Sequence, residues 1–214
     1  MTLKEKYSFA LNWWEETNPD ATSELNFNNN FELLVAVMLS AQCTDARVNT
    51  VTPALFKAYP NAEKMSKATE DDLLDFIKSV SYPNMKAKHL LSTAKMLTDL
   101  YKGEVPCTME ELTKLPGVGR KTASVILICA FNIPAMPVDT HVFRVSNRIG
   151  LTKSTTPEKT EKDLLKYIPS EKTNKAHHWI LLHGRYICTS RNPQCVICGL
   201  KEICDYYKKK IIRL

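Results

Sequence analysis

The chain has 214 residues, of which 44% are hydrophobic and 24% charged, a composition typical of a globular protein with a sizeable core. It has no apolar run near the roughly 18 residues that a membrane helix needs, and its first residues mix acids and bases unlike a secretory signal, so we expect a cytoplasmic protein. The net charge of +6 falls in residues 170–214, which hold 9 Lys and Arg against 3 Asp and Glu; this indicates either a polyanionic partner or a solvated basic face.

Apolar residues recur at helical spacing along nearly the whole chain, and no segment alternates as a strand does. Within residues 45–59, Pro53 marks either a kink or a fresh start capped by Thr52. Asp139 is expected to cap the helix that follows it, and Thr108 caps a short one. Helices are predicted over 31–39, 45–59, from 69, over 84–101, 109–115, from 120, from 140, and over 157–167, 177–188 and 200–208. The sequence therefore predicts an all-α fold.

Two glycines one residue apart separate the predicted helix that ends at 115 from the one that starts at Arg120. The string Pro116-Gly117-Val118-Gly119 lets the backbone turn sharply and leaves its amides uncovered. Those amides lie at a helix N-terminus, where unpaired N–H groups and the helix dipole favour an anion. A DNA phosphate fits such a site without any reading of base sequence. The alternative is a simple turn between two core helices.

Lys121 lies in the first turn after this hairpin, beside Arg120. The helix dipole and the neighbouring cation both disfavour its protonated form, and an unprotonated amine is a nucleophile. Taken alone, however, a surface lysine that binds phosphate is the more common case. Asp139 follows Pro137, and its carboxylate can either cap a helix or stabilise the positive charge that develops on a sugar as a glycosidic bond breaks.

Four of the seven cysteines lie close together, with six, two and five residues between them. A cluster of this kind in a chain without a recognisable signal indicates a metal rather than disulfides. Four thiolates can hold tetrahedral zinc or a [4Fe–4S] cluster, and the single Cys-x-x-Cys pair modestly favours iron–sulfur. The three scattered cysteines, Cys43, Cys107 and Cys129, are expected to be small core or surface residues. The four clustered ones are Cys188, Cys195, Cys198 and Cys204.

These features together resemble the endonuclease III family of helix-hairpin-helix DNA glycosylases. The resemblance runs from Glu24 to the last cysteine. It rests on the segments ELNF, LSAQCTD, LPGVGRKTA, VDTHVFRV and HHWILLHGRYIC and on the cysteine spacing.

The resemblance implies two helical domains, a monomer, and double-stranded DNA with damaged bases or abasic sites as the partner. Residues 23–134 would form a six-helix barrel domain that carries the hairpin. Residues 135–214 would form a cluster domain, joined by the N-terminal helix within residues 1–22. The implied activity is base excision repair of oxidised pyrimidines by a bifunctional DNA N-glycosylase and AP lyase.

The resemblance also implies roles for individual residues. Lys121 matches the nucleophile that forms a Schiff base with the sugar, and Asp139 matches the catalytic carboxylate. The four clustered cysteines match the [4Fe–4S] ligands. Gln42 matches a residue that fills the gap left by a flipped nucleotide. DNA contacts are expected from Gln42, Tyr82, Gly117, Val118, Gly119, Arg120, His141 and Arg191.

One segment departs from the family pattern, which commonly has Gly-Leu-Tyr-Asn or Gly-Phe-Tyr before Lys-Ala. Here the residues are Val80 to Ala87, VSYPNMKA. Tyr82 is expected to stack against the opposite base in place of an aliphatic wedge.

The sequence also allows two alternative functions. An adenine-mismatch glycosylase without lyase activity would share the hairpin and the cluster but would lack a lysine at position 121. A non-catalytic DNA-binding or redox-sensing module would leave Lys121 and Asp139 without a role.

Overall fold

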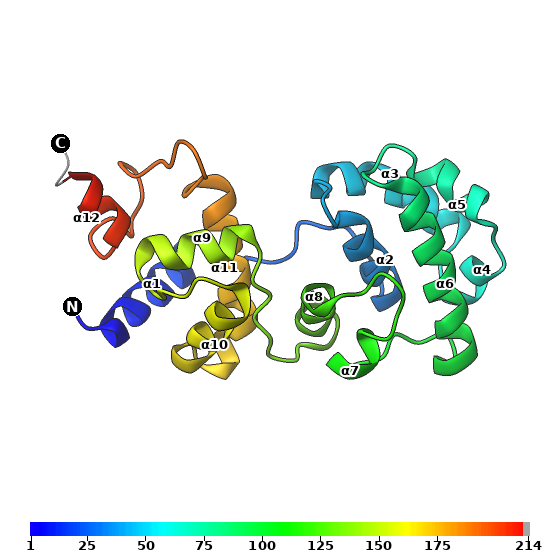
Figure 1. The fold of residues 1–214 in the computed structure, drawn as a ribbon, viewed down its shortest axis with the longest axis horizontal. Coiled ribbons are helices and arrows are strands. Elements are labelled where there is room, and N and C mark those ends of the chain that lie inside the picture. The colour runs from blue at the N-terminus through cyan, green and yellow to red at the C-terminus, as the bar shows by residue number, and fades with distance from the viewer. Residues whose placement is uncertain (212–214) are drawn as a thin grey trace. The chain divides into compact units, whose positions relative to one another are not determined.

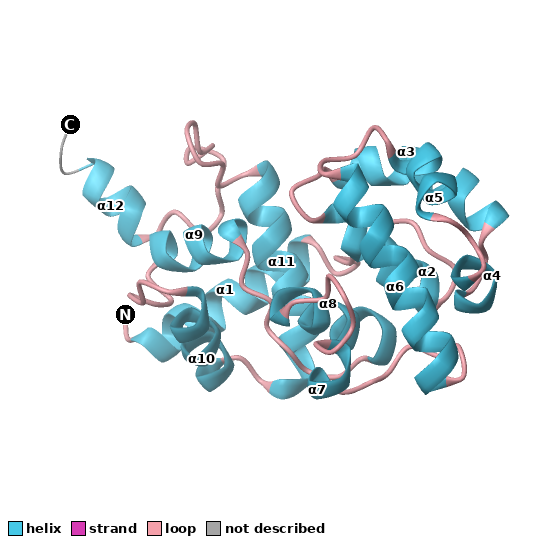
Figure 2. Cartoon of the chain, turned by 45° about the vertical axis from the view of Figure 1, so that its right-hand side comes forward, coloured by secondary structure: helices cyan, strands magenta, loops and turns pink. Residues whose placement is uncertain are grey.

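A computed structural model describes residues 1–211, and every regular element within them is a helix, which confirms the predicted all-α fold (Figure 2). None of these helices is both long and apolar enough to pass through a bilayer. The chain divides into two compact units, one made of Met1–Thr22 with Pro134–Leu214 and the other of Ser23–Ile133. The last three residues of the predicted cluster domain, 212–214, lie outside the described residues.

The unit Ser23–Ile133 is built around one buried helix. Its elements are α2 (Asn30–Ser40), α3 (Asp45–Ala58), α4 (Ala62–Ser66), α5 (Glu70–Ile77), α6 (Pro83–Tyr101), α7 (Met109–Leu112) and α8 (Arg120–Phe131) (Figure 1). Helix α2 is buried from Phe31 to Leu39 and contacts α3, α6 and α8. A helix that is apolar on all sides is stable only when neighbours cover it, so α2 fixes where these three lie.

The second unit joins both ends of the described chain. It contains α1 (Leu3–Thr17), α9 (Thr140–Ile149), α10 (Pro157–Tyr167), the short 3-10 helix η1 (Ser170–Lys172), α11 (Thr173–Tyr186) and α12 (Asp205–Ile211). Helices α9 and α11 pack closely because Gly184 leaves room; a Cβ there would lie 2.9 Å from the side chains of His141 and Val145. The indole of Trp179 donates to the carbonyl of Asn18 at 2.8 Å, which ties α11 to the end of α1.

Most helix starts lie where a capping side chain predicts them. The hydroxyls of Thr69 and Thr108 accept from the amides three residues later, and the carboxylate of Asp139 accepts from Val142 N at 2.7 Å. Each bond satisfies one of the amides that a helix start leaves unpaired. These caps confirm the predicted starts at residues 109 and 140, and they place Thr69, the predicted first residue of its helix, at the N-cap of α5.

Several predicted helix bounds are wrong. Helix α7 ends at Leu112 rather than 115, and α11 spans Thr173–Tyr186 rather than 177–188. Of the two alternatives at Pro53, the fresh start is excluded, because helix α3 continues through this residue. The predicted helix 200–208 instead begins at Asp205. Two overlapping four-residue turns precede it, in which Ile203 N donates to Leu200 O and Cys204 N to Lys201 O. Leu200 and Ile203 are buried, so their helix-like spacing reflects packing beneath a loop.

Candidate active site

The hairpin between α7 and α8 presents a backbone turn at the start of a helix. Val118 N donates to Leu115 O at 3.1 Å, and Gly119 is the N-cap of α8 with no side-chain cap. Gly117, Gly119 and Arg120 are exposed, whereas the Val118 side chain is 5% exposed and belongs to the core. The first amides of α8 therefore lack a side-chain partner at their N-cap and are arranged as an anion-binding site requires. Val118 could contact DNA only through its backbone.

Helix α6 packs against this hairpin. Thr93 Oγ1 donates to the carbonyl of Pro116 at 2.8 Å. Gly117 has φ +77°, and a Cβ at this position would lie 2.7 Å from Nδ1 and 2.9 Å from Cβ of His89. The turn thus needs glycine at residue 117 for two reasons, its left-handed backbone and the closeness of α6.

We expect Gly117→Ala to lower the free energy of unfolding by about 2 kcal/mol or more, because left-handed strain and a steric clash add. Gly103→Ala is the matched control: Gly103 has φ +82°, but a Cβ added there would meet no atom within 4 Å, so strain alone would cost about 1 kcal/mol. Urea denaturation measures both values. Duplex DNA binding is expected to weaken in Gly117→Ala and to stay unchanged in Gly103→Ala; equal effects of the two substitutions would contradict this account.

Lys121 lies in the first turn of α8 and is exposed. Its side chain therefore reaches solvent in the helix turn that directly follows the hairpin amides. An exposed amine in this position can approach a sugar whose phosphate is bound by those amides. The geometry is compatible with a nucleophile and with a phosphate ligand alike.

Gln42 and Tyr82 occupy two neighbouring turns of the same unit. Both have left-handed backbones, each with φ 55°, and both are exposed, Tyr82 to 64%. Ser81 Oγ donates to the carbonyl of Gln42 at 2.7 Å, which joins the two turns. The departure of residues 80–87 from the family pattern thus places an exposed aromatic ring on the turn next to that of Gln42.

Lys86 is a residue that the sequence analysis missed. Its side chain is buried, and Nζ donates to the carbonyls of Leu39 and Ala41 at 2.6 and 2.7 Å. Burial lowers the pKa of Lys86, yet its amine is directed at carbonyls at the end of α2 and not at solvent. It is therefore a structural residue of this turn and not a competing nucleophile.

Asp139 is half-buried at the N-terminus of α9, where Oδ1 accepts from Val142 N at 2.7 Å. His141 lies in the first turn of α9, and Nη2 of Arg144 donates to its Nδ1 at 3.2 Å. The imidazole is the acceptor because a guanidinium cannot accept a hydrogen bond. Arg144 also donates to the carbonyls of Gly184 and Cys188, at 2.7 and 3.0 Å. The start of α9 is thus rigidly held against the end of α11.

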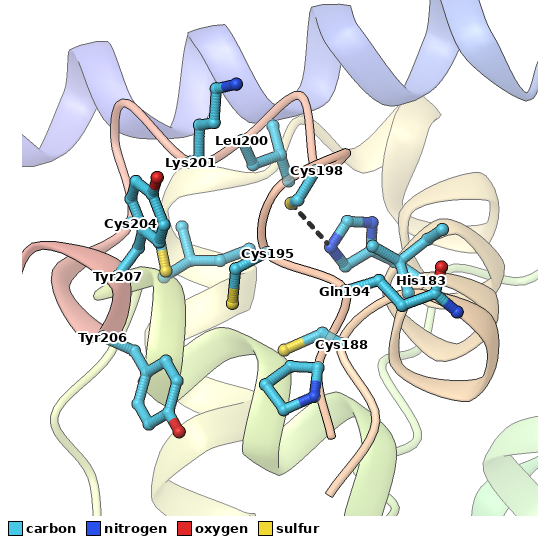
Figure 3. A pocket seen from close by; sticks show the side chains of 13 residues that line it. His183, Cys188, Gln194, Cys195, Cys198, Leu200, Lys201, Cys204, Tyr206 and Tyr207 are labelled. Carbon is cyan, nitrogen blue, oxygen red and sulfur yellow. Dashed lines mark hydrogen bonds between the residues drawn. The ribbon is translucent and has the colours of Figure 1, made fainter. Parts of the chain in front are cut away.

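The four clustered cysteines line one pocket, which Figure 3 shows. Cys188 follows α11, Cys195 and Cys198 lie in the loop, and Cys204 directly precedes α12. Burial raises the pKa of Cys198 to about 11 and also raises that of Cys204. Buried thiols become good ligands once a metal displaces their protons. The donor set therefore fits a thiolate-bound metal group.

Neighbouring side chains complete the cysteine pocket. Arg148 donates to Cys188 Sγ at 3.5 Å and to the carbonyls of Thr189 and Ser190, each at 2.7 Å, which orders the loop that carries the exposed Arg191. His183 Nε2 lies 3.6 Å from Cys198 Sγ. The sequence analysis did not identify Arg148 or His183 as part of this pocket. The one available signal for Arg148 was its i, i+4 spacing from Arg144.

The predicted site residues are thus brought into groups within each unit. Ser23–Ile133 contains Lys121, Arg120, the hairpin, Gln42 and Tyr82. The other unit contains Asp139, His141, Arg191 and the four cysteines.

Comparison with known proteins gives the class of this fold and site. The family described as the HhH-GPD superfamily base excision DNA repair protein matches residues 35–170, a span that includes the hairpin, Lys121 and Asp139. The chain is therefore a base excision DNA repair protein of this superfamily.

Individual relatives narrow the class to one family. Endonuclease III of Rickettsia felis is 51% identical over 93% of each chain, and that of Escherichia coli K12 is 43% identical over 96% of this chain and 98% of its own. A solved structure of a trapped endonuclease III–DNA covalent intermediate superposes with a TM-score of 0.93 at 43% identity, covering 99% of this chain and all of the other. The chain belongs to the endonuclease III family and is accordingly a DNA glycosylase and AP lyase of base excision repair.

Proposed function

We propose that Lys121 is the nucleophile of this enzyme and that Asp139 is its catalytic carboxylate. The observation that carries the proposal is the exposed Lys121 amine in the first turn of α8, immediately after the open amides of the hairpin. A phosphate bound by those amides would hold the backbone of a flipped nucleotide next to the amine. The trapped covalent complex of the relative with DNA supports a covalent route.

In the proposed reaction, the neutral Nζ of Lys121 attacks C1′ of the deoxyribose, and the bond from C1′ to the damaged base breaks. The base leaves with the bonding electrons and takes up a proton. Asp139 accepts the proton that Lys121 releases and stabilises the positive charge on the sugar.

The C1′–O4′ bond then opens, O4′ takes up the proton that Asp139 had accepted, and a protonated Schiff base forms between Lys121 and C1′. The iminium acidifies the C2′ proton, whose removal expels the 3′ phosphate by β-elimination and cuts the strand. Water hydrolyses the imine and restores the free amine of Lys121.

We propose that double-stranded DNA is held by backbone and side-chain contacts of both units. Gly117 and Gly119 would bind phosphate through their amides, while Val118, whose amide donates to Leu115 O, would hold the turn that faces the DNA backbone. Arg120 and Arg191 would add charge-assisted bonds. Gln42 would fill the gap of the flipped nucleotide, Tyr82 would stack on the opposite base, and His141 would contact DNA beside Asp139. The enzyme would act as a cytoplasmic monomer.

We propose a [4Fe–4S] cluster, bound by the four clustered cysteines. The four thiols line one pocket, and four thiolates can hold either tetrahedral zinc or a [4Fe–4S] cluster. Zinc ribbons usually pair two Cys-x-x-Cys knuckles, whereas this loop has one, which favours the cluster over zinc. Once bound, it would rigidify the loop that carries Arg191 and would take no part in the chemistry.

The purified protein is expected to be brown and to contain about four irons per chain. Visible absorption and metal analysis test this composition. Cys198→Ser is expected to lower the iron content and the thermal stability, while Cys107→Ser, which changes an exposed cysteine outside the pocket, leaves both unchanged. A colourless protein with one zinc per chain would overturn the assignment.

Oxidised pyrimidines are the proposed lesions. Strand nicking across a panel of damaged duplexes, with borohydride trapping in parallel, tests both the lesion class and the covalent route. Nicking and trapping on an oxidised pyrimidine, with little reaction on a mismatched adenine, is the expected pattern. DNA binding without either reaction would favour the non-catalytic module.

A further inference from the structure

One stripe of helix α6 touches both turns that are proposed to contact DNA. Tyr82, Lys86, His89 and Thr93 recur at the spacing of one helix face. Lys86 binds the end of α2, His89 abuts Gly117, and Thr93 binds the Pro116 carbonyl. Helix α6 is therefore the shared support of the Gln42 turn and the hairpin.

The position of Lys86 calls for a reason beyond stability. Lys86 is only 7% exposed as a residue, so its ammonium group loses most of its hydration, and both of its acceptors here are backbone carbonyls. These carbonyls lie at the C-terminal end of α2, where the helix dipole is negative. Methionine could fill the same space without the cost of desolvation. We therefore infer that the charged amine of Lys86 serves to hold the turn that follows α2.

That turn has a backbone conformation which needs support. Gln42 and Tyr82 both have φ 55°, a region that residues with a Cβ rarely occupy. Lys86 holds the carbonyl of Ala41, directly before Gln42, and Ser81 holds the carbonyl of Gln42 itself. The two residues proposed to enter the duplex are thus held from one side by three hydrogen bonds.

We propose that Lys86 and Ser81 are positioning residues that present Gln42 and Tyr82 as a preformed two-part wedge for duplex DNA. The inference rests on the proposed function, because only that proposal gives Gln42 and Tyr82 a role in the duplex. Preorganisation lowers the ordering that must accompany insertion into a base stack. Loss of the hydrogen bonds from either residue therefore impairs extrusion of the nucleotide rather than the chemistry at C1′.

The test compares double-stranded with single-stranded substrate. A lesion in a duplex must be extruded, whereas an abasic site in a single strand needs no wedge. Lys86→Met, which keeps the length of the side chain, is expected to slow nicking of a lesion duplex about tenfold, as for loss of one or two hydrogen bonds. Borohydride trapping on single-stranded abasic DNA should stay within about twofold of wild type. The fluorescence of 2-aminopurine opposite the lesion should rise less on binding than with wild type.

Three further variants make the result specific. Ser81→Ala should reproduce the effect, and Ser81→Thr, which keeps the hydroxyl, should restore it. Lys88→Met removes an exposed charge from the same helix and should behave as wild type. If Lys86→Met does not fold, the Ser81 pair decides the question.

Two results would overturn the inference. One is a parallel loss on duplex and single-stranded DNA, and the other is an unchanged rate and 2-aminopurine signal in Lys86→Met and Ser81→Ala. Failure of the proposed function would look different, because wild-type protein would then form no adduct with single-stranded abasic DNA.

Discussion

Lys121→Ala is expected to abolish the borohydride-trapped adduct with abasic DNA and to lower lyase activity by about 10⁴-fold or more, because the covalent route has no other amine in the same place. Binding to an abasic duplex should weaken only modestly, since the hairpin amides and Arg120 remain. Denaturing gels of the trapped complex and an equilibrium binding titration measure the two effects.

Lys114→Ala is the matched control for this substitution. Lys114 is exposed on the other side of the hairpin, where its Nζ lies 3.6 Å from a carboxylate oxygen of Glu110. Its loss removes the same charge from the same region and should leave trapping intact. An undiminished adduct in Lys121→Ala would refute the assignment of the nucleophile, and loss of the adduct in both variants would point to charge alone.

Asp139→Asn separates the two uses of this carboxylate. Asparagine caps helices about as well as aspartate, so the bond from Val142 N and the free energy of unfolding should be retained. The anion that stabilises the cationic sugar and accepts a proton is lost, and the rate of base removal should fall about 10³-fold. Single-turnover kinetics and urea denaturation measure rate and stability on the same protein.

Asp139→Ala provides the comparison for the cap. It should lose the same activity and, in addition, about 1 kcal/mol of stability. If Asp139→Asn keeps wild-type activity, the carboxylate serves only as a cap and the proposed mechanism loses its acid–base residue.

Local sequence signals predicted the part of the fold that depends on local chemistry. Thr108 and Asp139 cap helices as expected because a side-chain oxygen and an amide three residues later suffice to form the bond. The segment 200–208 was mistaken for one helix because Leu200 and Ile203 are spaced as on a helix but pack beneath a turn. Periodicity alone does not distinguish these two cases.

The supporting contacts of the candidate site could not be predicted from the sequence. The bonds from Lys86 to residues 39 and 41, and from Arg148 to residues 188–190, join segments distant along the chain, and no local pattern encodes such pairs. Lys121 and the cysteines were singled out because their motifs are contiguous. Lys86 and Arg148, whose contacts join distant segments, could be identified as supporting residues only from the folded structure.

The insertion of Ser23–Ile133 between α1 and Pro134 has a consequence for biosynthesis. Helix α1 leaves the ribosome before this unit does, yet the apolar side of the helix, with Tyr7, Leu11 and Trp14, packs in a core completed by residues from Met136 to Ile203. The intervening unit has its own core and can fold as soon as it emerges. The aromatic side chains of α1 therefore stay uncovered until translation has passed Ile203.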